Sequence, residues 1–179
     1  MSPIDLQPAQ RNDWQCLENL MQFYLYELSE WLPLELGRHG LFEIQSLDRY
    51  WRQPGTRPWL LRVDGELAGF AVVDDKVHLA QAQHNLAYLF VARRFRGRGI
   101  GRQVVTQLLA PRPGQWQVFH IDANRPARDF WARVVPQLSG GAFSCQPSTA
   151  DGYPCTLYAF HIPLSPGQRS NAYVGGRPT

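Results

Sequence analysis

The feature that most constrains this chain is the stretch from Leu86 to Arg102, in which an apolar run leads through a loop of arginines and glycines into an amphipathic segment. The run Leu86 to Val91 has no polar alternation, which is typical of a central strand covered on both faces. The segment after the loop has one apolar face, formed by Ile100, Val104, Val105, Leu108 and Leu109. We therefore expect a strand, a glycine turn and a helix in direct succession.

A strand, a glycine turn and a helix start form a binding site for phosphate groups. Glycines let the backbone approach an anion closely, and the first free N–H groups of the helix point at it with a favourable dipole. Guanidinium groups add forked donors suited to phosphate oxygens, and this loop carries Arg93, Arg94, Arg96, Arg98 and Arg102. The sequence thus predicts a site for a phosphorylated small molecule, against the alternatives of a solvated turn or an RGG-like nucleic-acid segment.

Spacing excludes two other phosphate loops. A dinucleotide-binding loop needs Gly-x-Gly-x-x-Gly; Gly97 and Gly99 fit, but Arg102 stands at the third position and the next glycine comes one residue early, at Gly101. A P-loop needs Lys-Ser or Lys-Thr after its last glycine, where this chain has Arg102-Gln103.

The rest of the chain predicts how elements are arranged around this loop. We expect further strands at Ile4–Leu6, Trp59–Val63, Leu67–Val73, Trp116–Ile121, Ala142–Cys145 and Thr156–Ile162, and helices at 13–31, 47–52, 100–110 and 124–138. Hairpins followed by strand–helix–strand–helix and then strands again predict an α/β fold with a mixed sheet and helices on both faces. Residues 163–179 are rich in Pro, Gly, Ser and Arg and are expected to form a tail.

The composition is that of a single globular domain. The chain has 179 residues, 44% of them hydrophobic and 18% charged, and this length suffices to bury a substantial core. Its three cysteines, Cys16, Cys145 and Cys155, lack metal-ligand spacing, and no segment resembles a signal peptide or a membrane span. We therefore expect a cytoplasmic protein with no metal site and no membrane partner.

The net charge argues against a nucleic-acid partner. It is +3 overall, and because five positive charges lie within Arg93 to Arg102, the remainder of the chain carries −2. A nucleic-acid-binding protein normally spreads its basic residues over a face or along a helix. Here they gather where a small polyphosphate would sit.

Two motifs in this order resemble those of the GNAT superfamily of acyl-CoA-dependent N-acetyltransferases. Arg94-Phe-Arg-Gly97-Arg-Gly99 matches the signature Arg/Gln-x-x-Gly-x-Gly/Ala, and Asn124-Arg-Pro-Ala127-Arg-Asp-Phe130-Trp131 is similar to the second motif, Asn-x-x-Ala-x-x-Phe/Leu-Tyr. Arg62-Val-Asp-Gly-Glu-Leu-Ala-Gly-Phe70 is similar to a branch of predicted acetyltransferases of unassigned substrate. The resemblance implies a GNAT domain over residues 1–162: a single-domain α/β fold whose mixed, mostly antiparallel sheet has two splayed central parallel strands.

The resemblance also implies where acetyl-CoA, the co-substrate, would bind. Its diphosphate would lie on the loop and the helix start, against Arg94, Arg96, Gly97, Arg98, Gly99, Ile100, Gly101 and Arg102. Its pantetheine arm would contact the backbone of Phe90, Val91 and Ala92 and the side chains of Asn124 and Trp131. From the residues alone, Phe90 to Ala92 could equally be core strand, and Asn124 could be a helix cap.

Acetyl transfer to an amine needs a neutral amine, a stabilised oxyanion and a fate for the leaving thiolate. By resemblance, the N–H of Val91 or a neighbour would serve the oxyanion. Trp131 stands where relatives carry the tyrosine that protonates the thiolate, and an indole N–H is not a useful acid. Tyr88, on the central strand, and His120 or Asp122, near the end of the next strand, are the substitute catalytic candidates; a packed core residue is the alternative for Tyr88 and His120.

We therefore expect an N-acetyltransferase that moves an acetyl group from acetyl-CoA to a primary amine of a small molecule or peptide, by direct attack in a ternary complex. A non-catalytic acyl-CoA sensor on the same fold is the alternative that Trp131 suggests. Glu27, Glu30, Glu35 and Glu43 could make the acceptor entrance acidic or could be ordinary surface carboxylates. GNAT proteins often dimerise, so the resemblance also allows a homodimer.

Overall fold

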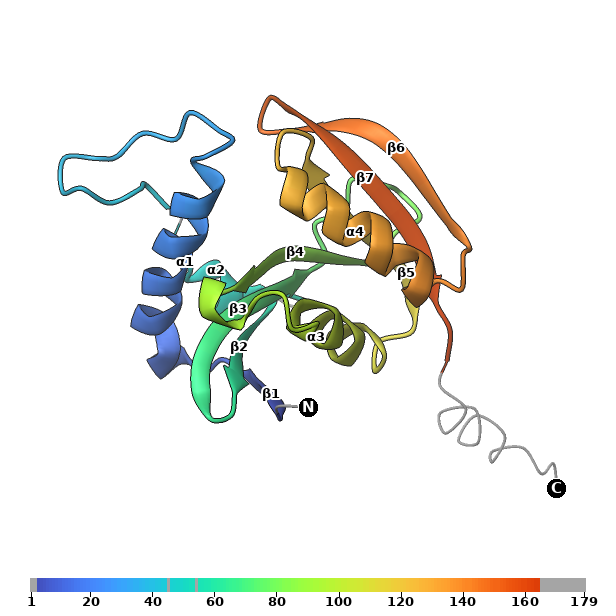
Figure 1. Ribbon diagram of the computed structural model, residues 1–179, viewed down its shortest axis with the longest axis horizontal. Helices are drawn as coiled ribbons and strands as arrows, with labels where there is room; N and C mark the ends of the chain where they lie inside the picture. Colours follow the sequence, from blue (N-terminus) through green and yellow to red (C-terminus); the bar gives the residue numbers. More distant parts are fainter. Residues whose placement is uncertain (1–2, 45, 54, 165–179) are drawn as a thin grey trace, which may run out of the picture.

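One mixed sheet organises the protein. The computed structural model describes residues 3–44, 46–53 and 55–164, and within these ranges seven strands form a single sheet in the order β1-β2-β3-β4-β5-β7-β6 (Figure 1). All neighbouring strands are antiparallel except β4 and β5, which are parallel. The strands are β1 (Ile4–Pro8), β2 (Arg57–Val63), β3 (Glu66–Asp74), β4 (His84–Val91), β5 (Gly114–Ile121), β6 (Phe143–Ala150) and β7 (Tyr153–Ile162).

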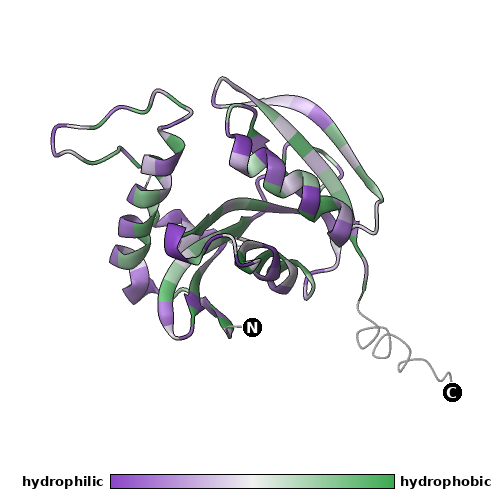
Figure 2. Cartoon of the chain, in the orientation of Figure 1, coloured by the Kyte–Doolittle hydropathy of each residue, from purple (hydrophilic) through white to green (hydrophobic). Residues whose placement is uncertain are grey.

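Helices cover both faces of this sheet. One face packs on α1 (Trp14–Leu28) and α2 (Arg49–Arg52) through a core that contains Leu17, Tyr50 and Phe70; the other packs on α3 (Ile100–Leu109) and α4 (Arg125–Leu138) through a core that contains Val104, Trp116 and Val135. The central strands are mainly hydrophobic, whereas α1 and α4 alternate between hydrophobic and hydrophilic residues, as amphipathic helices do (Figure 2). The short 3-10 helices are η1 (Arg11–Asp13) and η2 (Arg93–Phe95).

The parallel pair β4–β5 is joined only at its beginning. Within the described strands, His84 pairs with Trp116 and Asn85 pairs with Gln117, and the ladder ends there. Just beyond, the register of β4 against β3 shifts, because Val72 pairs with Tyr88 while Val73 pairs with Leu86, which leaves Ala87 as an extra residue. A bulge of this kind bends its strand, and Figure 1 shows β4 and β5 diverging toward their ends.

A buried polar network closes the joined end of the two strands. The Gln117 side chain is fully buried, and its carbonyl oxygen accepts hydrogen bonds from the backbone N–H groups of His78 (2.9 Å) and Leu79 (3.2 Å). Its amide donates to Asn85 Oδ1 at 3.3 Å, and Asn85 donates to Asp74 Oδ1 at 2.9 Å. Burial raises the pKa of Asp74, and the hydrogen bond from Asn85 partly opposes that effect. The network ties the β3–β4 loop to the point where the strands part.

The fold predicted from the sequence is confirmed: a single mixed, mostly antiparallel α/β sheet with helices on both faces. The main difference is β6, which continues to Ala150 although Pro147 interrupts the pattern. Proline lacks a backbone donor and is tolerated on edge strands, and β6 is the edge of this sheet. The predicted tail falls mostly on residues 165–179, outside the described residues, so the domain boundary stays a prediction.

Replacing Gln117 with Leu tests whether the polar network holds the junction. The leucine fills a similar volume but leaves two buried N–H groups without an acceptor, which should lower the free energy of unfolding by about 2–4 kcal/mol. The measurement is urea denaturation, with the exposed Gln107→Leu on α3 as the control, for which we expect a change within about 0.5 kcal/mol. Equal stability of the two variants would contradict this role.

Candidate acetyl-CoA site

The open edge of β4, the edge facing β5 beyond their paired ends, carries the backbone groups of Leu89 and Val91. The Ala92 N–H donates to Ala68 O at 2.8 Å, so Ala92 belongs to the ladder with β3. The Phe90 carbonyl also faces β3, since a Cβ on Gly69 would lie 2.0 Å from its oxygen. Consecutive residues of a strand point their backbone N–H and C=O groups to opposite edges. Of Phe90, Val91 and Ala92, the three predicted backbone contacts, only Val91 therefore lies on the open edge. Leu89 could not be predicted as a contact, because an apolar run does not show which backbone groups face which edge of the sheet.

The turn after β4 is shaped by two glycines in the left-handed region. Phe95 is buried and anchors η2, and the chain then passes Gly97 (φ 76°) and Gly99 (φ 74°) before α3 begins. Residues with a Cβ rarely adopt such angles. A Cβ on Gly97 would have no described atom within 4 Å, and one on Gly99 would reach only Gln103 Nε2, at 3.9 Å. The turn is therefore open on the side where a bound group would approach.

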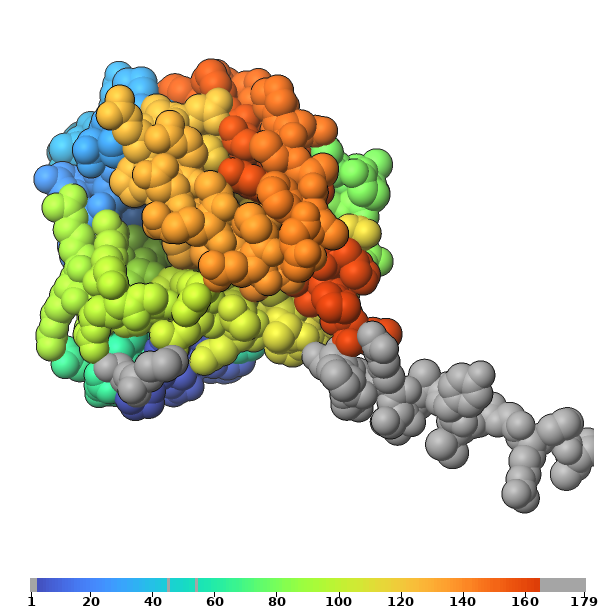
Figure 3. Space-filling model, turned by 45° about the vertical axis from the view of Figure 1, so that its right-hand side comes forward, coloured from blue at the N-terminus to red at the C-terminus, as the bar shows by residue number. Residues whose placement is uncertain are grey.

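The first turn of α3 has N–H groups without helical acceptors. Its first backbone bond runs from the Gln103 N–H to Gly99 O at 3.2 Å, and Gly99 has no side chain to cap the helix. The N–H groups of Ile100, Gly101 and Arg102 precede that bond, and a helix start of this kind attracts anions. In the space-filling view, the yellow-green start of α3 lies at the surface between the amber α4 and the blue β1 (Figure 3).

The glycine signature fits the chain in a second register that the sequence reading missed. Arg96-Gly-Arg-Gly99-Ile-Gly101 matches Arg/Gln-x-x-Gly-x-Gly/Ala as well as Arg94 to Gly99 does. Only the second register places both motif glycines at the observed helix start. Gly101 has a packing role there, because a Cβ would meet the Phe130 ring of α4 at 3.0 Å.

The predicted phosphate-binding arginines have partners within the protein. Arg94 makes a two-pronged ion pair with Glu66 (2.7 and 3.0 Å), on the hairpin between β2 and β3. Arg102 donates to Gln137 Oε1 on α4 at 3.3 Å, and Arg98 is exposed in the glycine turn. The side chains of Arg94 and Arg102 are thus held on the flanks of the turn, and the backbone amides face the open space.

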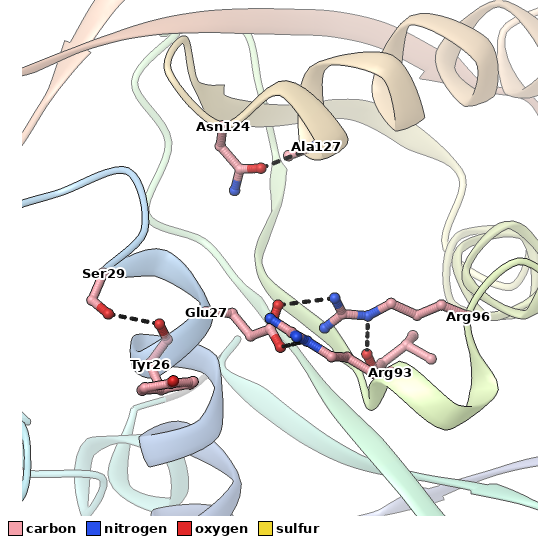
Figure 4. A network of polar contacts seen from close by, with 8 residues as sticks. Tyr26, Glu27, Ser29, Arg93, Arg96, Asn124 and Ala127 are labelled. Atoms are coloured by element: carbon pink, nitrogen blue, oxygen red, sulfur yellow. Dashed lines mark hydrogen bonds and ion pairs between the residues drawn. The ribbon is translucent and has the colours of Figure 1, made fainter.

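Glu27 of α1 joins two of the loop arginines. Its carboxylate accepts from Arg93 Nε at 2.5 Å and from Arg96 Nη1 at 3.0 Å, and Arg96 Nε donates to Val91 O at 2.6 Å (Figure 4). Burial would raise the pKa of Glu27, but the hydrogen bonds from the two arginines outweigh it and hold that pKa below its usual value. We call this arrangement the Glu27 bridge. It spans from α1 to the end of the open edge.

Asn124 faces the Glu27 bridge from the other side. Its side chain caps α4 by accepting from the Ala127 N–H at 3.1 Å, so the helix-cap interpretation is confirmed. Figure 4 shows its amide nitrogen directed away from the helix, toward the side of Glu27 and Arg96. One side chain can therefore cap the helix with its oxygen and offer its N–H groups to a bound molecule.

Trp131 is buried in the core between the sheet and the helices α3 and α4, with 6% of its surface exposed. Its ring meets Phe130 edge-on, with centroids 4.9 Å apart. These contacts make it a packing residue of α4, which agrees with the poor acidity of an indole N–H.

Tyr88 lies half-buried on the α1 face of β4. Its ring meets that of Tyr24 edge-on at a centroid distance of 5.5 Å, and it packs in the same core as Tyr50. Burial raises the pKa values of Tyr24 and Tyr50, and the neighbouring Tyr88 raises both further, while a hydrogen bond from Arg49 lowers that of Tyr50. Tyr88 and Tyr24 are both half-buried, whereas Tyr50 is buried, and the three belong to one cluster on this face of the sheet.

His120 lies on the opposite face of the sheet. It is 4% exposed, and its ring lies 5.9 Å from that of Tyr158, in the core under α3 and α4. Its Nδ1 lies 3.1 Å from Ile121 O, whereas Nε2 is buried and finds no partner among the described residues. The structure therefore does not bring the two catalytic candidates together on one face.

A cavity of about 310 Å³ lies between α1 and the loop that follows it. Two of the predicted entrance carboxylates, Glu35 and Glu43, line it together with apolar side chains that include Leu25, Leu36 and Phe42. Glu27 does not line it and is engaged by arginines instead. Of the four acidic residues singled out in the sequence, two therefore share a cavity.

Two general features of the described residues bear on function. Across 3–44, 46–53 and 55–164, no group of three or more His, Cys, Asp or Glu side chains could hold a metal ion. No helix in that part of the chain has the length and apolar character needed to cross a membrane.

Solved structures share this fold. An acetyltransferase from Thermus thermophilus superposes with a TM-score of 0.63 at 19% identity, over 89% of this chain and 97% of its own. The ribosomal-protein-S18-alanine N-acetyltransferase of Escherichia coli gives 0.56 at 15% identity, over 96% and 99%. An acetyltransferase from Bacillus anthracis str. Ames, solved in complex with acetyl coenzyme A, gives 0.53 at 11% identity, over 89% and 100%. At these identities the likeness concerns the fold.

The family is given by a sequence model. The model of the Acetyltransferase (GNAT) family matches residues 17–135, which run from α1 through the glycine turn into α4. No curated protein sequence matches the chain significantly. The match covers well over half of the chain and includes both motifs, the splayed strands and the open helix start. The chain belongs to the GNAT family of acetyltransferases and is an acetyl-CoA-dependent N-acetyltransferase.

Proposed function

We propose that this enzyme transfers the acetyl group of acetyl-CoA to a primary amine of its acceptor by direct attack within a ternary complex. The observation that carries the proposal is the continuity of the open edge of β4 with the glycine turn and the uncapped start of α3. These features place two sets of backbone N–H groups along one path: those of Leu89 and Val91 on the open edge of β4, and those of Ile100, Gly101 and Arg102 at the start of α3, with the bonded turn of residues 92–96 between them. Such an arrangement suits a ligand with an amide-bearing arm that ends in two phosphates.

In this proposal the backbone of residues 97–102 holds the diphosphate, and Leu89 and Val91 hold the pantetheine arm. The amine nitrogen attacks the thioester carbonyl, a C–N bond forms, the C–S bond breaks and the amine gives up a proton. The N–H of Val91 stabilises the charge that develops on the carbonyl oxygen. The leaving thiolate has a pKa of about 8.5 as a thiol and is a tolerable leaving group.

Tyr88 is our first candidate for proton transfer. It lies on the α1 face of β4, next to the open edge, and its hydroxyl belongs to a hydrogen-bonded tyrosine cluster. His120 is the second candidate, because a buried ring nitrogen without a partner is uncommon. Trp131 would contribute packing only.

The acceptor in this proposal carries a cationic amine next to an apolar group. The cavity beside α1 combines the carboxylates of Glu35 and Glu43 with leucine and phenylalanine side chains. Carboxylates attract an ammonium group, and the apolar lining suits a hydrocarbon substituent. Small amines and peptide N-termini both fit this description.

Gly99→Ala tests the phosphate site. The wild type at about 100 times the dissociation constant should gain roughly 2.7 kcal/mol from acetyl-CoA. A Cβ at Gly99 would face the bound phosphates, so we expect at least about tenfold weaker binding, near 1.4 kcal/mol, measured by thermal shift and calorimetry. Gly140→Ala is the matched control, because Gly140 also has a positive φ (61°) and open surroundings but follows the end of α4. Equal effects of both variants on binding would argue against the site.

Tyr88→Phe tests the proton-transfer role. The ring contact with Tyr24 is kept while the hydroxyl is lost, so folding should be preserved and kcat should fall on the order of 10²-fold. The assay follows release of free thiol from acetyl-CoA with a panel of cationic amines. Tyr26→Phe, an exposed tyrosine on α1, is the control. If Tyr88→Phe keeps full activity while His120→Gln loses it, the role belongs to His120.

A further inference from the structure

The Glu27 bridge has two features that the proposed function does not explain. It brings together charges from α1 and from the phosphate loop, which are 66 and 69 residues apart in sequence. It also covers the last carbonyl of the open edge, because Arg96 donates to Val91 O. Both features place a protein carboxylate where loop arginines would otherwise be available to a ligand.

We propose that Glu27 competes with the diphosphate of acetyl-CoA for Arg93 and Arg96, so that the two arginines exchange the carboxylate for phosphate oxygens when the co-substrate binds. The inference rests on the proposed function and adds Glu27, which lies outside the loop, as a residue that sets the affinity of the site for acetyl-CoA. In the free enzyme Glu27 stands in for the ligand's negative charge. In the complex it would be released on the wall of the site.

Exposure and charge favour exchange over a fixed structural bridge. The side chains of Arg93 and Arg96 are 70% and 42% exposed, so Arg93 can turn through solvent, and Arg96 gives up only its contact with the Phe90 ring, whose centroid lies 5.8 Å from its guanidinium carbon. Glu27 is 24% exposed, so these pairs are open to solvent mainly on the arginine side, and ion pairs at the surface are weak. A diphosphate offers more charge and more acceptor oxygens than one carboxylate, and bonds from arginine to phosphate are among the strong charge-assisted ones.

Geometry links the exchange to the rest of the site. Arg96 directly precedes Gly97, so its side chain starts at the edge of the phosphate turn. When it leaves Glu27 it also leaves Val91 O, which returns a carbonyl to the open edge. The same movement frees the Glu27 carboxylate opposite Asn124 (Figure 4). Binding of acetyl-CoA would thereby change the surface that the acceptor meets.

The test measures acetyl-CoA affinity by calorimetry for the wild type, Glu27→Gln and Glu30→Gln. Competition predicts that Glu27→Gln binds acetyl-CoA about three- to tenfold more tightly, the range that two exposed ion pairs support. Glu30 is the matched control: it lies three residues further along, just beyond the end of α1, is exposed and forms no ion pair with a described residue. Its replacement removes the same charge without removing the bridge and should change affinity less than twofold.

A double-variant cycle separates exchange from general electrostatics. Arg96→Gln should weaken acetyl-CoA binding several-fold, and adding Glu27→Gln to it should restore much less affinity than Glu27→Gln adds to the wild type. Hydrogen exchange gives a second readout. Acetyl-CoA should speed exchange of the last turns of α1 in the wild type and leave it unchanged in Glu27→Gln.

Three results would overturn the inference. Weaker binding by Glu27→Gln would mean that the bridge orients the arginines for the ligand. Equal tightening by Glu27→Gln and Glu30→Gln would mean a diffuse charge effect, and unchanged affinity would mean a purely structural bridge. Failure of the wild type itself to bind acetyl-CoA would count against the proposed function instead, so the two failures are distinguishable.

Discussion

The site depends on β4 and β5 being bonded at one end and separate at the other. Neighbouring strands normally continue their ladder, because unpaired backbone groups are costly when buried. Here the ladder stops after the pair Asn85–Gln117, where buried amide and carboxylate side chains bind the β3–β4 loop across the junction. The Ala87 bulge then turns β4 away. Beyond this point the backbone groups of Leu89 and the N–H of Val91 remain available for a ligand, whereas the Val91 carbonyl accepts from Arg96.

The candidate phosphate site has a fixed part and an adaptable part. The fixed part is the backbone, in which two glycines and the uncapped start of α3 set the direction of the N–H groups. The adaptable part is the set of arginines, which the protein holds with Glu66, Glu27 and Gln137. Backbone amides need no rearrangement to accept an anion, whereas each long side chain loses rotamer freedom when it binds. In the proposed site, binding by the backbone amides therefore costs less conformational entropy than binding by the arginines.

Most of the fold could be predicted from the sequence, because hydrophobic periodicity and turn residues act locally. The hairpin at Asp64-Gly65, the run from Leu86 to Val91 and the proline at the start of α4 each place an element within a few residues. The ends of helices and strands are harder to predict where tertiary contacts determine them. Strand β6 survives Pro147 because that strand lies at the edge of the sheet, and position in a sheet is not a local property.

The candidate site could be predicted in its backbone but not in its side-chain partners. Glycine spacing points to the turn, yet nothing in the sequence pairs Glu27 with Arg93 or assigns Tyr88 and His120 to opposite faces. These placements depend on how α1 packs and on the Ala87 bulge between β3 and β4, and both involve segments that are far apart in the sequence. The identity of the backbone groups on the open edge has the same origin, since it follows from the register between β3 and β4.

That bulge has a consequence for the two halves of β4. On a regular strand, residues two positions apart share a face, as Leu86 and Tyr88 would. The extra residue between them instead sends Leu86 toward α3 and Tyr88 toward α1. The alternation of side chains between the two faces of β4 therefore reverses at Ala87. Pairing Ala87 into a regular ladder, with no residue removed, would restore a uniform alternation and put either a tyrosine hydroxyl into the apolar layer beneath α3 or a leucine into the tyrosine cluster. The Ala87 bulge thus determines which side chains of β4 face α1 and which face α3.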